Sequence, residues 1–119
     1  MKELTKAEEQ VMQVVWRLQS CFIKEILEAL PEPKPAYNTV GTFIKLLEGK
    51  GFLERKKVGN VYAYSPLINE RDYSRKSIKT LMGKFFNGSS QDMLSFLVEE
   101  QELTLDQIED LMKKLKKND

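Results

Sequence analysis

The side chains between residues 38 and 45 have the types and spacing of a helix face that could contact DNA. This face carries Asn38, Thr39, Gly41, Thr42 and Lys45. An asparagine amide can pair with adenine through two hydrogen bonds, and a threonine offers a hydroxyl to bases or phosphates and a methyl group to thymine. A helix can approach a ligand closely at a glycine. An ordinary solvated helix face has a similar composition, so the surrounding residues must decide between the two interpretations.

A cluster of basic residues follows this segment and leads to a turn at Gly59 and Asn60. Arg55, Lys56 and Lys57 stand directly before the turn. Cationic side chains near the tip of a hairpin can lie along the phosphates of a duplex. The same charges on an exposed strand also discourage aggregation, and that alternative stays open. We interpret the three residues as contacts to the DNA backbone.

No pattern in the sequence predicts catalysis or a metal site. The carboxylates of Glu99, Glu100 and Glu102 belong to one polar run, and no motif pairs a nucleophile with a base. The chain has no histidine and one cysteine, Cys21, so it lacks the commonest zinc ligands and cannot form an internal disulfide. We expect no enzyme activity, no metal and no cofactor, and a buried structural role for Cys21.

Three amphipathic helices are predicted before residue 52. Thr5 and Glu8 have the spacing of a capping box, and apolar residues recur at helical spacing over 11–18, 23–30 and 40–47. The prolines of the PEPKP stretch end the second helix, and the Gly49-Lys50-Gly51 stretch ends the third. These helices would present the polar face of residues 38–45 to solvent.

A β-hairpin is predicted after the third helix. Residues 52–57 and 61–65 are rich in β-formers and flank a Gly-Asn pair suited to a tight turn, and Pro66 closes the second strand. Three helices followed by a hairpin indicate a winged helix-turn-helix. The predicted fold is mainly α with a small β-hairpin wing, in a DNA-binding domain of residues 1–68.

Residues 69–119 are predicted to form a helical dimerisation domain. Asn87-Gly88-Ser89 separates two helices, Thr104 and Gln107 have capping-box spacing before a third, and the middle helix is apolar nearly all round. About fifty residues cannot surround such a helix alone, so a second copy of the chain is expected to cover it. The apolar residues assigned to this interface are Ile78, Leu81, Met82, Phe85, Met93, Leu94, Phe96, Leu97, Ile108, Leu111, Met112 and Leu115.

The composition describes a folded protein without a strong charge. Of the 119 residues 41% are hydrophobic and 31% charged, and the net charge is +1, so charge alone does not indicate a nucleic-acid partner. The first residues have no apolar core of the signal-peptide type, and no run of about 18 apolar residues occurs. We expect a cytoplasmic protein.

The sequence resembles the penicillinase repressor family of the BlaI/MecI/CopY type over almost its whole length. ELTKAEEQVMQVVW is similar to the family opening, EILEALPEPKPAYNTVGTFIKLLEGKGFLERKKVGNVYAYSPL to its helix-turn-helix and wing, and FFNGSSQDMLSFLVEEQELTLDQIEDL to its dimerisation region. The resemblance implies a homodimeric repressor that binds inverted repeats built around TACA and TGTA. It also implies that repression of β-lactamase or related operons ends when a membrane sensor with a zinc-protease domain triggers cleavage of the repressor.

Three features depart from the family pattern. Gly41 stands where several staphylococcal-type members have an arginine in the recognition helix, which leaves the exact base preference open. Phe96 and Leu97 correspond to the scissile Asn-Phe pair of those members, and we expect this region to be the cleavage region. The C-terminal cysteine cluster of the copper-responsive branch is absent, which excludes copper sensing through that cluster.

Two other functions stay open at this point. The first is a winged-helix regulator that senses a small molecule directly in a pocket between its halves. The second is a winged-helix module that binds a protein and never DNA.

Overall fold

The computed structural model describes residues 2–117. The chain divides into two compact units, and the division falls between Ser74 and Arg75. None of the helices in the described range is both long enough and apolar enough to span a membrane.

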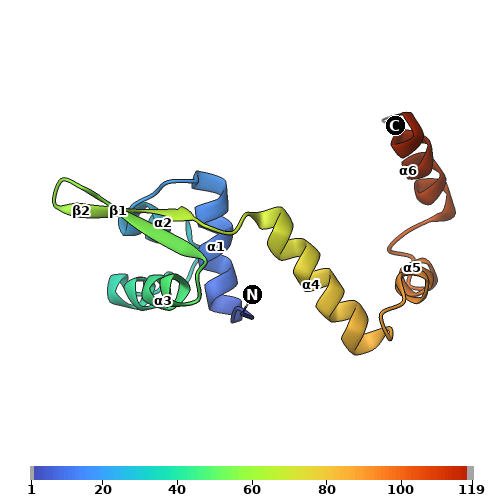
Figure 1. Cartoon of the computed structure of the whole chain (residues 1–119), viewed down its shortest axis with the longest axis horizontal. Coiled ribbons are helices and arrows are strands. Elements are labelled where there is room, and N and C mark those ends of the chain that lie inside the picture. Colours follow the sequence, from blue (N-terminus) through green and yellow to red (C-terminus); the bar gives the residue numbers. More distant parts are fainter. Residues whose placement is uncertain (1, 118–119) are drawn as a thin grey trace. The chain divides into compact units, whose positions relative to one another are not determined.

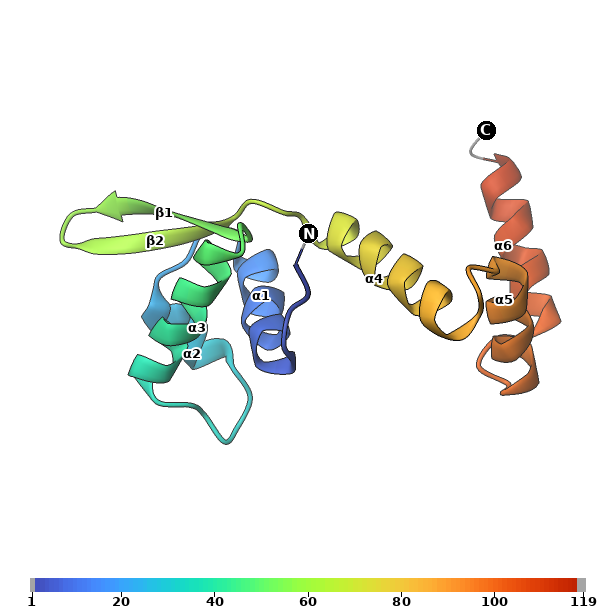
Figure 2. The same cartoon turned by 60° about the horizontal axis from the view of Figure 1, so that its bottom comes forward.

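The first unit has the predicted order of three helices and a hairpin. Its elements are α1 (Lys6–Leu18), α2 (Ile23–Ala29), α3 (Tyr37–Gly49), β1 (Leu53–Val58) and β2 (Val61–Pro66). The two strands form an antiparallel sheet of their own, which lies along one side of the helices and extends beyond them at its tip (Figure 1; Figure 2). The predicted winged helix-turn-helix is therefore confirmed.

Side chains close to the helix ends explain where these helices begin and end. The hydroxyl of Thr5 accepts a hydrogen bond from the backbone N–H of Glu8 at 3.2 Å, and the Glu8 carboxylate accepts one from the N–H of Thr5 at 2.8 Å. This is the predicted capping box of α1. The ammonium group of Lys34 donates to three carbonyl oxygens at the end of α2, at 2.7 to 3.1 Å. The last carbonyls of a helix lack their usual backbone partners, so Lys34 stabilises the end of α2 and the turn that leads into α3.

The core of the first unit lies between the helices and the hairpin. Met12, Ile26, Ile44, Leu47 and Phe52 are its largest fully buried apolar side chains. They come from all three helices and from the start of the hairpin, so burial of this core fixes the position of α3 against the wing.

Cys21 is part of this core, in agreement with the predicted structural role. Its backbone pairs with that of Tyr64 through two hydrogen bonds of 3.0 and 2.8 Å. Burial, with a smaller effect of the Glu25 charge, raises the pKa of the thiol to about 11. The thiol is therefore protonated at neutral pH and unreactive as a nucleophile.

A buried ion pair joins the start of α1 to the end of α3. The Glu8 side chain is only 1% exposed, and its Oε1 lies 2.7 Å from Nζ of Lys50. Burial alone would raise the pKa of Glu8, but hydrogen bonds from Lys50 and Thr5 have the larger combined effect, so this pKa lies below its ordinary value. Glu8 is therefore ionised at neutral pH.

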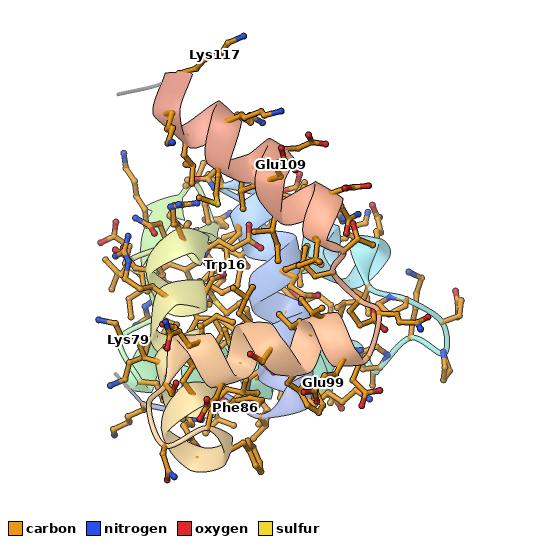
Figure 3. All side chains as sticks on the ribbon, turned by 90° about the vertical axis from the view of Figure 1, so that its right-hand side faces the viewer. Trp16, Lys79, Phe86, Glu99, Glu109 and Lys117 are labelled. Carbon is orange, nitrogen blue, oxygen red and sulfur yellow. The ribbon has the colours of Figure 1, made fainter. Side chains whose placement is uncertain are left out.

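The second unit consists of helices in the part of the chain described. α4 (Glu70–Phe85) runs into it, and α5 (Ser90–Glu99) and α6 (Leu105–Lys117) follow. Thr104 and Gln107 form the predicted capping box, with hydrogen bonds of 2.9 and 3.1 Å. None of the described side chains of these three helices is buried. Figure 3 shows the side chains that these helices carry.

The beginning of α4 is attached to the first unit. The ring of Tyr73 lies 5.5 Å from that of Trp16 and 5.7 Å from that of Phe52, measured between ring centroids. Nε1 of Trp16 also donates to the carbonyl of Ile68 at 2.8 Å. Packing of the first unit therefore continues beyond the hairpin as far as Tyr73.

Candidate nucleic-acid interface

The polar face of α3 lines a groove between this helix and the hairpin. Asn38, Gly41, Thr42 and Lys45 contribute from the helix and Arg55 from β1, and the space measures about 390 Å³. We call it the α3 groove. Five of the eight residues predicted to contact DNA thus lie together on one surface.

The orientation of α3 follows from its opposite face. Val40, Ile44 and Leu47 are buried in the core, so the side that carries Asn38 and Lys45 points outward. Gly41 adds to the accessibility of this side, because a Cβ built there would meet no atom of the described residues within 4 Å.

The two predicted threonines differ in their surroundings. The hydroxyl of Thr42 lines the α3 groove and donates to the backbone carbonyl of Asn38 at 3.1 Å. This bond fixes the hydroxyl proton and leaves the oxygen lone pairs and the methyl group for an outside partner. Thr39 is exposed on the same helix but is not part of the groove lining.

The strand register separates the three basic residues of the wing. Arg55 pairs with Tyr64, Lys56 with Ala63 and Lys57 with Tyr62. Paired residues share a face of the sheet and successive residues alternate. Arg55 and Lys57 therefore lie on the face that carries the two tyrosines, whereas Lys56 lies on the other face. All three basic side chains are exposed.

Arg55 links the wing to α3. Its Nε lies 3.7 Å from Oε2 of Glu48, and its guanidinium carbon lies 4.5 Å above the centre of the Tyr62 ring. Ion pairs as exposed as this one contribute at most about 1 kcal/mol. The guanidinium can therefore exchange Glu48 for a phosphate at small cost.

Tyr37 and Glu48 belong to this surface although the sequence analysis did not single them out. Tyr37 and Glu48 line the α3 groove. A signal for them exists in the sequence, because they stand four residues before Gly41 and three after Lys45 and so extend the same helix face. The alternation of the second strand places Tyr62 and Tyr64 on one side as packing residues, but the contact of Tyr62 with Arg55 depends on the strand register.

The residues assigned to a dimer interface are accessible in the single chain. Among them Met82, Met93, Leu97 and Ile108 are partly buried. The others are exposed: Ile78, Leu81, Phe85, Leu94, Phe96, Leu111, Met112 and Leu115. Phe96 lies in α5 and packs on Phe86, with 5.6 Å between the ring centroids.

The described residues offer no obvious metal centre. Within residues 2–117, no group of three or more His, Cys, Asp or Glu side chains is placed to hold a metal ion.

Comparison with protein families and known proteins gives consistent matches over most of the chain. The family model described as penicillinase repressor matches residues 4–117. The methicillin resistance regulatory protein MecI of Staphylococcus aureus is 31% identical over 116 residues, which cover 97% of this chain and 94% of that protein. The penicillinase repressor of Bacillus licheniformis is 29% identical over 110 residues, covering 92% and 86%.

Two solved structures resemble part of the chain. The DNA-binding domain of the repressor BlaI aligns with a TM-score of 0.53 and 34% identity, covering 61% of this chain and 94% of that one. The monomeric form of Bacillus licheniformis BlaI in complex with the blaP half-operator aligns with a TM-score of 0.51 and 33% identity, covering 60% and 89%.

Proposed function

The chain belongs to the penicillinase repressor family of DNA-binding transcriptional repressors, which are not enzymes, and we propose that it binds inverted-repeat operators as a homodimer and is inactivated by proteolysis. The operator is a TACA/TGTA-like inverted repeat, and the regulated genes serve β-lactam resistance, as the names of the relatives suggest. The protein acts in the cytoplasm, where operator DNA is accessible. The observation that carries this proposal is the outward polar face of α3 beside the basic wing.

The α3 helix reads the operator in the major groove. Asn38 and Thr42 supply the donors, acceptors and methyl group that distinguish base pairs, and Thr39 and Lys45 lie beside them. The absence of a side chain at Gly41 allows the helix backbone to approach the base edges. This assignment is supported by the exposure of Asn38, Thr39, Thr42 and Lys45 and by the buried residues on the opposite side of the helix.

The wing binds phosphates and so positions α3. Arg55 and Lys57 lie on the face of the hairpin that carries Tyr62 and Tyr64, and we assign them to the phosphates beside the bases read by α3. Lys56 faces the other way and reaches a phosphate only at the edge of the wing. Contacts of this kind hold the protein in register but do not discriminate sequences.

The helices of the second unit form the dimer. Leu111, Met112 and Leu115 are 53%, 54% and 58% exposed, and Phe85 is 73% exposed. Water contact with so many large apolar side chains is unfavourable, at about 25 cal/mol per Å² of apolar surface. A second copy of the same helices would cover them with a matching surface, as two-fold symmetric interfaces do.

Inactivation separates the DNA-binding head from the dimer. The proposed cleavage region, Phe96 and Leu97, lies in α5, where the carbonyl of Phe96 accepts a hydrogen bond from Glu100 at 2.9 Å. A protease must first unwind this turn, which breaks the backbone hydrogen bond at Phe96. The protease partner is a membrane sensor with a zinc-protease domain.

A gel-shift titration tests the repressor function. The duplexes are an operator with a TACA/TGTA inverted repeat and a scrambled duplex of the same length and composition. We expect the operator to bind at least about a thousandfold more tightly, with an affinity that falls as salt is raised. Equal affinity for both duplexes at every salt concentration would reject sequence-specific binding.

A further inference from the structure

The loop that joins α2 to α3 has few backbone donors of its own. It comprises residues 30–36, and every second residue from 31 to 35 is a proline (Figure 2). A proline has no backbone N–H, so within 31–35 only Glu32 and Lys34 can donate a hydrogen bond from the main chain. The N–H of Lys34 donates to Oε2 of Glu32, inside the loop, at 3.3 Å. Attachment of the loop to α2 therefore requires a side chain.

The ammonium group of Lys34 supplies this attachment. Its Nζ lies 3.1, 2.8 and 2.7 Å from the carbonyl oxygens of Leu27, Glu28 and Leu30. An ammonium group has three N–H groups, so these three bonds engage all of them. The side chain of Leu30 is only 5% exposed, so the end of α2 that receives the bonds is anchored in the core of the first unit. Lys34 thus ties the loop to a fixed point and directs its donors away from any outside ligand.

The start of α3 lacks the side-chain cap that begins α1 and α5. Thr5 and Ser89 cap those two helices, whereas the residue before α3 is Ala36, whose methyl group cannot accept a hydrogen bond. The backbone N–H groups of Thr39 and Val40 donate to the carbonyl of Ala36 at 3.0 and 3.1 Å. The place where α3 begins therefore depends on where the loop holds Ala36.

We propose that Lys34 is a positioning residue for base recognition. By holding the loop on the end of α2, it sets where α3 begins and so where the first turn presents Asn38 and Thr39 to the operator. The proposal rests on the proposed function, because it concerns the same base-reading face of α3. Lys34 itself does not contact DNA in this account, since it acts through the loop and Ala36.

This role predicts a loss of specificity and not of general affinity for DNA. Hydrogen bonds to base edges weaken steeply when donor and acceptor are misaligned, whereas the attraction between cations and phosphates extends over about 10 Å. Lys34→Met removes the ammonium group and keeps an unbranched side chain. We expect its affinity for a TACA/TGTA operator to fall about tenfold, and its affinity for a scrambled duplex to stay within about twofold of wild type. Lys34→Arg keeps a cationic donor and should bind the operator within about threefold of wild type.

Amide hydrogen exchange of the free chain tests the same role without DNA. In Lys34→Met the N–H groups of Thr39 and Val40 should exchange at least about tenfold faster than in wild type, because the turn that they close is held less firmly. The N–H groups of Ile44 and Leu47, farther along the same helix, should exchange at the wild-type rate. Faster exchange at the start of α3 alone separates a shift of this turn from a general loss of stability.

Lys6→Met serves as the control, because it removes an exposed lysine from α1. We expect wild-type affinity and exchange in this variant. A direct phosphate contact of Lys34 would overturn the inference, and it would appear in Lys34→Met as equal losses for both duplexes and a salt slope smaller by about one unit. The inference is also wrong if Lys34→Met discriminates between the duplexes as wild type does, or if exchange stays unchanged at Thr39 or rises equally throughout α3. If the wild-type chain does not distinguish the duplexes, the proposed function itself is wrong.

Discussion

At the scale of single residues, the α3 groove brings together two kinds of side chain with different tasks. We propose base recognition for Asn38 and Thr42, and phosphate contacts for Arg55 in the same groove and for Lys57 on the adjoining wing. Substitutions of the two kinds should therefore affect specificity and overall affinity separately.

Thr42 provides the test of base reading. Thr42→Ala should weaken operator binding by about 1 to 3 kcal/mol if the residue reads a base, with little effect on random DNA. Thr42→Val keeps a methyl group and removes the hydroxyl, so it distinguishes contact with a thymine methyl from a hydrogen bond. Gel-shift titrations with both duplexes give these values.

Thr80 offers a matched control for Thr42. Its hydroxyl makes the same type of bond, to the carbonyl of Lys76 at 3.0 Å, but it lies on α4 outside the α3 groove. We expect Thr80→Ala to leave operator affinity unchanged. An equal loss in Thr42→Ala and Thr80→Ala would show that the effect arises from helix stability and not from base reading.

The two wing lysines should differ because they lie on opposite faces of the hairpin. Lys57→Ala should weaken binding to operator and random DNA alike and reduce the salt slope by about one unit. Lys56→Ala should have a smaller effect on both quantities. Titrations between about 50 and 200 mM salt measure the slopes. A larger effect of Lys56 would place the DNA on the other face of the wing.

At the scale of elements, the sequence predicts the order and nearly all boundaries of the helices and strands. The capping boxes at Thr5 and Thr104, the prolines after α2 and the Gly-Asn turn act locally, so a single sequence reveals them. Contacts between distant residues carry no such signal. The pair of Glu8 and Lys50 lies 42 positions apart, and the stacking of Arg55 on Tyr62 depends on the strand register.

The packing of Tyr73 is a second example of a distant contact. It lies in the helical region after the wing, and its polar neighbours in sequence do not predict that it packs on Trp16 and Phe52. Sequence reasoning thus finds the polar face of α3 and the basic residues of the wing, but it cannot identify which part of α4 belongs to the first unit.

The ion pair of Glu8 and Lys50 should make the stability of the first unit depend on pH. The pKa of Glu8 is lowered in the folded state, so the stabilisation is complete above its ordinary pKa of about 4.5 and is lost as the pH falls through the lowered value. Glu8→Gln keeps a side chain suited to the capping box and should lower the free energy of unfolding at pH 7 by about 2 kcal/mol.

Urea unfolding of both chains at pH 7 and pH 3 measures this contribution. The difference in unfolding free energy between wild type and Glu8→Gln should be smaller at pH 3 than at pH 7. The exposed Glu28→Gln serves as a control that changes the same charge elsewhere on the first unit. A difference that does not shrink at pH 3 would show that the ionised state of Glu8 is not what stabilises the fold.

At the scale of the whole molecule, the two units differ in how completely each one buries its apolar residues. The first unit has a core of its own and continues to Tyr73, whereas the described helices of the second unit bury no side chain. The first unit should therefore fold alone, and the second should require a second copy of the chain. Two linked heads bind the operator more tightly, because once one head is bound the other meets its half-site at a high effective concentration. The gain in affinity is a factor of about 100 to 10,000.

The most direct test compares the full chain with a fragment of residues 1–77, which keeps Tyr73 and ends before Ile78. Sedimentation and titration of the intact operator are measured for both. We predict a dimeric full chain and a folded monomeric fragment that binds the operator at least about a hundredfold more weakly. A monomeric fragment that binds the intact operator as tightly as the full chain would contradict control of repression through dimerisation.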